Sequence, residues 1–229
     1  MKKIISFIAA ISLWQLVCMP VYAFDQADLD KLLKTKKCEK CDLSGANLEK
    51  ADLQKAEIRQ SNFTGANLMN ADLRDISASG SDFSSANLSG ATLRYAHIPG
   101  SNFSGANLSN ADMFISYLER SNFVRANMEN CNLEKADMTG ADLQESILIK
   151  ANLHMADLTS ANMRKAVMDN ANLHKSILNL ADLRGASLKN VILHGAYTGK
   201  AKLDNDAIEY AKEQGAQFIM YKGKECSDE

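Results

Sequence analysis

The sequence predicts an all-β solenoid, in which the chain winds in short, straight-sided coils around a narrow core. The main observation is a repeat of five residues that keeps its phase from Cys41 to Leu203. Its centres are large apolar residues such as Leu43 and Leu48, and a small residue stands two positions before nearly every centre. A period of five fits neither a helix nor a flat strand, so the chain must turn a corner once per unit for both residues to point inward.

The unit reads Ala-(Asp/Asn)-Leu-x-x, as at Ala46-Asn47-Leu48, and it resembles the pentapeptide-repeat family. That resemblance implies a right-handed quadrilateral β-helix in which four units complete one coil of twenty residues. The repeats span residues 38–203, enough for about eight coils of that size.

Two columns with a period of twenty residues support this coil independently of the resemblance. Phenylalanine replaces the usual central leucine, with serine two residues before it, at Phe63, Phe83, Phe103 and Phe123. We expect these rings to stack on one side of the core and to fill the space that the small serines leave. Asparagine precedes the centre at Asn47, Asn67, Asn87, Asn107 and Asn127, which predicts a ladder of side-chain amide bonds between coils.

The N-terminal residues 1–23 have the pattern of a secretory signal peptide. Lys2 and Lys3 precede an apolar run, and small residues before Phe24 predict cleavage after Ala23. An uncleaved membrane anchor is the alternative, although the run is short for a membrane span. The mature protein is therefore expected in a bacterial periplasm or outside the cell, without membrane association.

Both ends of the solenoid carry sequences typical of short helical caps. In residues 24–37, Asp25 can cap a helix that carries Leu29, Leu32 and Leu33 on one stripe. Residues 204–229 contain Ala207, Ile208 and Ala211 at helical spacing, then Gly215 as a stop signal, a short strand expected over 218–221 and a tail. Such caps cover the backbone groups that a first or last coil leaves unpaired.

Cys38 and Cys41 form a Cys-x-x-Cys pair at the start of the repeats, and both are in phase to point inward. In an exported protein this pair predicts a structural disulfide or paired core thiols. A redox role or a metal site stays open, although no second Cys-x-x-Cys completes a zinc site.

The outward positions would carry any function, and two clusters stand out. The first is a histidine column with a period of twenty at His154, His174 and His194. Imidazoles about 5 Å apart could share a metal ion or respond to pH through the repulsion of like charges. Alternatively, equivalent positions in a repeat drift toward the same residue without a function.

The second cluster places apolar and aromatic residues at outward positions of consecutive coils. It comprises Tyr95, His97, Phe114, Ile115 and Tyr117. Such a patch predicts contact with an unknown protein partner or with a second copy of the chain. Irregular local packing is the alternative.

Several functional classes find no support in the sequence. There is no nucleophile with a paired base, so an enzyme is not expected, and no cofactor motif occurs. Nucleic-acid binding would need a basic stripe with aromatics, which is missing. Some members of the family resemble duplex DNA and bind topoisomerases, but that needs a strongly acidic surface. This chain has a net charge of only -2 and mixed outward signs, so an interaction scaffold is the favoured function and a metal- or pH-responsive binding protein the alternative.

Overall fold

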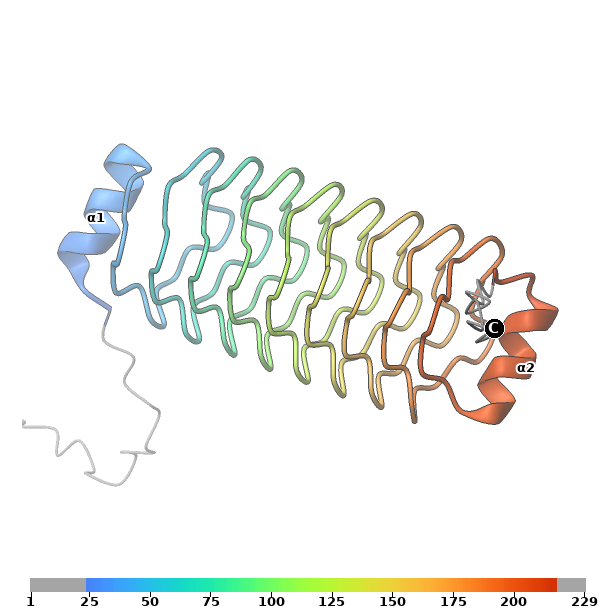
Figure 1. The fold of residues 1–229 in the computed structure, drawn as a ribbon. Helices are drawn as coiled ribbons and strands as arrows, with labels where there is room; N and C mark the ends of the chain where they lie inside the picture. The colour runs from blue at the N-terminus through green and yellow to red at the C-terminus, as the bar shows by residue number, and fades with distance from the viewer. Residues whose placement is uncertain (1–23, 218–229) are drawn as a thin grey trace, which may run out of the picture.

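The computed structural model describes residues 24–217. A stack of coils lies between helix α1 (Gln26–Thr35) at one end and helix α2 (Asn205–Glu213) at the other (Figure 1). The predicted signal peptide at 1–23 and the strand expected at 218–221 lie outside the described residues. Within the described range, neither helix combines the length and the apolar content that a membrane crossing needs.

Each coil pairs in parallel with the next, residue by residue, at a separation of twenty. At one such bridge, the Leu68 amide donates to the Asn87 carbonyl at 2.7 Å, and the Asn87 amide donates to the Ala66 carbonyl at 2.9 Å. The bridges within residues 24–217 are isolated, because a corner follows too soon for a longer ladder to form. The predicted register is therefore confirmed, while each side of a coil contributes single bridging residues and not an extended strand.

The corners are tight turns that place one residue per unit in the left-handed region. At one of them the Ala71 amide donates to the Leu68 carbonyl at 3.0 Å, and Asn70 between them has φ of 56°. A positive φ at the third residue of a turn is the mark of type II geometry, which favours glycine and asparagine. Gly45, Gly65 and Gly105 occupy such corners, so the non-central positions of the repeat are constrained as well.

Leucine centres and the alanines two residues before them fill the core, as the repeat predicts. The phenylalanine column is also confirmed, because successive rings from Phe63 to Phe123 stack with centroids 5.0, 4.9 and 4.9 Å apart. The neighbouring serines do more than leave space. The Ser81 hydroxyl donates to the Ile58 carbonyl at 2.7 Å and accepts the Ser61 amide at 3.2 Å, and this pattern continues to Ser101 and Ser121.

The asparagine ladder forms as expected on the outer surface. The Asn67 amide donates to Asn47 at 3.0 Å, and the next three rungs to Asn127 measure 3.4, 3.3 and 3.3 Å. Each Asp or Asn before a centre also accepts the backbone amide two residues later, as Asp72 does from Arg74 at 3.2 Å. One oxygen of each of these acids is therefore bonded to the backbone, as at Asp52, Asp72, Asp112 and Asp142.

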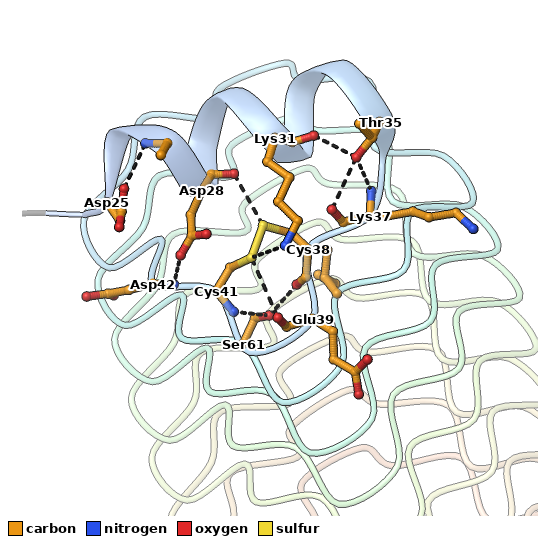
Figure 2. The surroundings of a disulfide bond; sticks show 12 residues. Asp25, Asp28, Lys31, Thr35, Lys37, Cys38, Glu39, Cys41, Asp42 and Ser61 are labelled. Atoms are coloured by element: carbon orange, nitrogen blue, oxygen red, sulfur yellow. Dashed lines mark hydrogen bonds between the residues drawn. A yellow bond between two sulfur atoms is a disulfide. The ribbon is translucent and has the colours of Figure 1, made fainter.

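Helix α1 covers the first coil and lies above a disulfide (Figure 2). The Asp25 carboxylate accepts the Ala27 amide at 2.8 Å and so caps the helix as predicted. Leu32 is fully buried, whereas Leu33 is 53% exposed. The prediction of a shared stripe is therefore wrong for Leu33, because adjacent residues on a helix point about 100° apart.

A disulfide joins Cys38 and Cys41 in the first coil, where both side chains are buried. The Ser61 hydroxyl donates to the Cys38 carbonyl and accepts the Cys41 amide at 3.0 Å, which ties this loop to the second coil. The Asp28 carboxylate of α1 accepts the Asp42 amide at 2.9 Å. Helix, disulfide and first two coils therefore form one connected unit.

Helix α2 closes the other end with Ala211 buried against the core. The Tyr210 hydroxyl donates to the Val191 carbonyl at 2.9 Å. Gly215 follows the helix with φ of 75°, in agreement with the predicted stop signal. Gln217 then pairs with Tyr197, so the coil register resumes after the helix.

Phe103→Ala should lower the free energy of unfolding by about 3–5 kcal/mol, because it opens a cavity between two stacked rings. Phe114→Ala, at a half-buried surface position, should cost clearly less. Chemical denaturation of the two variants and the wild type measures both losses. Equal losses would show that the phenylalanine column does not carry the core.

Candidate interaction face

Each of the four faces of the solenoid is defined by the outward residues that bridge successive coils. Three of the faces carry side-chain hydrogen bonds of amide groups from coil to coil. One has the asparagine ladder, a second has Asn62 donating to Asp42 at 3.0 Å, and the third has Asn132 donating to Asp112 at 2.9 Å. These side chains satisfy one another, so they are less available to a ligand.

The fourth face has a different character. Its central residues from Lys37 to Gln217 include Ser77, His97, Tyr117, Asp137, Asp157, Ile177 and Tyr197. Across residues 24–217, no amide ladder links these side chains. Aromatic rings, single carboxylates and an aliphatic side chain therefore face outward here, and we call this surface the fourth face.

The structure brings the predicted aromatic cluster together at the fourth face and its adjoining corner. The Tyr95 and Phe114 rings meet edge to face with centroids 6.0 Å apart, and His97 meets Tyr117 in the same way at 5.8 Å. Tyr95 and Tyr117 are 45% and 44% exposed. Edge-to-face pairs of this kind contribute about 0.5–1.5 kcal/mol each, so the cluster is preorganised.

Phe114 and Ile115 are half-buried, so the expected exposed patch is only partly present at these two positions. The Arg94 guanidinium lies 4.5 Å from the Phe114 centroid, and the Lys135 ammonium lies 5.7 Å from it. Asp112 accepts a hydrogen bond from Arg94 at 3.0 Å, which raises the pKa of the guanidinium above its ordinary value. These two cationic side chains therefore cover the Phe114 ring, whereas the Tyr95 and Tyr117 rings remain accessible.

Ile115 occupies a left-handed corner with φ of 53°. A β-branched residue is strained in this region by roughly 1–2 kcal/mol, and none of the other left-handed corners within residues 24–217 holds a β-branched residue. The sequence alone did not reveal this strain, although the corner phase of the repeat was the signal that could have done so. Strained residues cluster at functional sites, so the corner at Ile115 is a candidate for partner contact.

The histidine column stacks as its spacing predicts. The ring centroids of His154, His174 and His194 are 5.1 and 5.4 Å apart, with planes within 7° of parallel. His154 Nδ1 lies 2.9 Å from the His174 carbonyl oxygen, and His174 Nδ1 lies 2.7 Å from that of His194. A carbonyl can only accept, so Nδ1 must donate at both rings.

This arrangement has one feature of a metal site and lacks another. Ligating histidines usually donate their second nitrogen to a carbonyl or carboxylate, as His154 and His174 do. However, zinc binds nitrogen at about 2.0–2.1 Å, so one ion cannot reach equivalent atoms of parallel rings 5.1 Å apart. A shared ion would require at least one ring to leave the stack, and the metal role of the column stays a prediction.

Within residues 24–217, one potential metal-ligand group of three is present, formed by Asp28, Cys38 and Cys41. The disulfide consumes both sulfurs, so this group cannot bind a metal in the oxidised form. The remaining cysteine of the described range, Cys131, is buried, and burial raises the pKa of its thiol to about 12. It is a core residue and not a nucleophile.

The two predicted surface clusters belong to one continuous strip. The histidine column follows the same corner as Arg94 and Phe114, farther along the solenoid, and His97 lies on the adjoining fourth face. Three hollows of about 200, 500 and 410 Å³ also border this face, at Glu57, Asp137 and Tyr197 respectively. Neither their position nor their common face was predicted from the sequence.

Comparison with known proteins agrees with the coil geometry. The family model "Pentapeptide repeats" matches eight copies, which together span residues 37–114 and 116–197. The chain belongs to the pentapeptide-repeat family. Its fold is therefore that of the family, the right-handed quadrilateral β-helix, here with a short helix at each end.

Solved structures show the same fold. HetL, a pentapeptide repeat protein involved in heterocyst differentiation regulation from the cyanobacterium Nostoc sp. strain PCC 7120, is 30% identical, with a TM-score of 0.56. The match covers 76% of this chain and 88% of HetL. A trypsin-treated form of QnrB1, a plasmid-mediated fluoroquinolone resistance protein, matches with a TM-score of 0.56 and 18% identity, over 76% of this chain and 95% of that one. No curated protein matches the sequence.

Zinc should not stabilise the wild-type protein more than the His174→Ala variant at neutral pH, because a single ion cannot contact two stacked rings. Thermal unfolding with and without zinc measures the difference. A zinc-dependent rise in the unfolding temperature that His174→Ala abolishes would contradict this expectation and establish a metal site at the column.

Proposed function

We propose that this pentapeptide-repeat protein is an exported, non-enzymatic scaffold that binds a partner protein through its fourth face. The observation that carries the proposal is the difference between the faces. On three faces, outward amides and carboxylates bond to one another from coil to coil. Within residues 24–217, only Lys37 and Glu57 form such a pair on the fourth face, and Tyr117, Tyr197 and Asp137 remain for contact. Aromatic anchors with a polar rim are typical of protein interfaces.

The strained corner supports the same face. Ile115 costs folding free energy in a left-handed corner, and neighbouring Tyr95 also has positive φ. An exposed or half-exposed apolar side chain gives little stability in return. Contact with a partner would offset the free-energy cost of the strained Ile115, whereas irregular local packing of the cluster would not.

The DNA-mimic function does not account for this surface. Several outward acids pair with nearby arginines, as at Asp72 with Arg74 and Asp182 with Arg184. Outward bases are thus interspersed with the acids, which argues against a continuous acidic field on the described faces. The likeness to QnrB1, at 18% identity, indicates the fold and not a shared target.

Export is supported by the disulfide in the first coil. Disulfides persist in oxidising compartments and are rare where thiols are kept reduced. Cys38 and Cys41 therefore fit a periplasmic or extracellular protein that has lost residues 1–23.

Protein recovered from the periplasm or medium should begin at Phe24, because the predicted signal peptide is removed after Ala23. Mass spectrometry of the N-terminal peptide checks this boundary. An intact Met1 in protein from the cytoplasm would contradict export.

A photo-crosslinking residue at Tyr117 should capture a discrete partner in intact cells, whereas the same residue at Glu49 should not. Glu49 is exposed on a corner away from the fourth face. An adduct of twice the chain's mass would identify a homodimer, and any other single mass a foreign partner. Equal adducts at both positions, or none at Tyr117, would contradict the proposal.

Ile115→Asn should weaken that adduct while raising the free energy of unfolding by about 1 kcal/mol, since asparagine tolerates the left-handed corner. Ile149→Asn is the matched control, because Ile149 is half-buried at a corner but has no positive φ. The control should neither stabilise the fold nor reduce the adduct. Destabilisation by Ile115→Asn with an unchanged adduct would remove the argument from strain.

A further inference from the structure

The hollow of about 500 Å³ beside Tyr117 has a chemistry that narrows the choice of partner. It is lined by Pro99, Gly100, Glu119, Arg120, Asp137 and Thr139. A side chain at Gly100 would meet nothing within 4 Å, so the absence of one keeps this corner open. Asp137 pairs with Tyr117 across the coils, so the exposed Tyr117 is the neighbour of a lining residue.

Glu119, which lines this hollow, has one unsatisfied carboxylate oxygen. Glu119 Oε2 is buried and has no hydrogen-bond partner, and it is the one such side-chain atom among residues 24–217. A buried charged oxygen without a donor is more costly than an unpaired neutral group. A ligand in the hollow that draws the Glu119 carboxylate toward its own donors would recover that cost.

The surrounding charges favour a cationic donor. Neither Glu119 nor Asp137 has an ion-pair partner within 4.0 Å in the described part of the chain. One Asp137 oxygen accepts the Thr139 amide at 3.0 Å, which leaves the other for a ligand. Arg120 also lines the hollow, so two carboxylates face one guanidinium and the balance is negative.

We propose that this hollow binds the side chain of an arginine from the partner protein. The planar guanidinium can donate to Glu119 and Asp137 together and can lie against the exposed Tyr117 ring. The inference rests on the proposed function, because it identifies what the partner presents to the fourth face. Arg120 opposes the bound charge and therefore weakens binding.

The test titrates isotope-labelled full-length protein with N-acetyl-arginine amide and, separately, with the citrulline analogue, which has the same shape but no charge. The arginine probe should shift the amide resonances of Gly100 and Gly140 saturably. The citrulline probe should bind about tenfold more weakly, since it lacks charge-assisted hydrogen bonds. Equal binding of both probes, or no shift with arginine, would overturn the proposal.

Matched variants separate the roles of the two charges. Glu119→Gln, which keeps the shape, should weaken the arginine probe about tenfold, whereas Arg120→Gln should strengthen it. Glu129→Gln lies outside the hollow and should change nothing. An unaltered spectrum at distant glycines such as Gly45 checks that each variant is folded, and equal affinities of wild type and Glu119→Gln would refute the site.

These outcomes remain distinct from those of the proposed function. A crosslink at Tyr117 that persists in Glu119→Gln, with no binding of the arginine probe, would leave the scaffold intact and remove this inference. Arginine binding without any partner adduct would keep the arginine site and remove the scaffold proposal.

Discussion

Every coil of this protein lies directly over the one before it, and that register governs both the interior and the surface. Each side chain meets its own counterpart twenty residues away, so a residue type that bonds to itself is stabilised along the whole column. Phenylalanine stacks inside, serine hydroxyls bridge backbone groups beside it, and asparagine forms a ladder outside. Self-complementarity between coils therefore takes the place of a conventional globular core.

The same rule explains why one face is available for binding. A column that pairs with itself has satisfied its polar groups, which describes much of three faces. On the fourth face, His97, Tyr117 and Asp137 follow one another without side-chain hydrogen bonds between coils, so their side chains remain available to a partner. The cost appears locally as a strained Ile115 and an unsatisfied Glu119 oxygen. Both features lie on or beside the same face, where partner contacts could compensate for them.

Much of this architecture could be predicted from the sequence because the period fixes which residues share a column. The phenylalanine stack, the asparagine ladder, the histidine stack and the capping role of Asp25 all follow from spacing. Features that depend on rotamers and corner geometry could not be predicted in this way. The Nδ1 bonds of the histidines, the orphan oxygen of Glu119 and the cationic cover over Phe114 need coordinates, and the outward direction of Leu33 depends on how α1 is seated.

The central claim is that residues twenty apart lie directly above one another along a straight axis. Distances between spin labels on one corner test it most directly, with the first label at Glu49 and the second at Ser109, Glu129 or Asp169. The account predicts separations of about 14, 19 and 29 Å, which increase by about 4.8 Å for each coil. Distances that do not rise linearly with coil number would contradict the register and, with it, the fourth face.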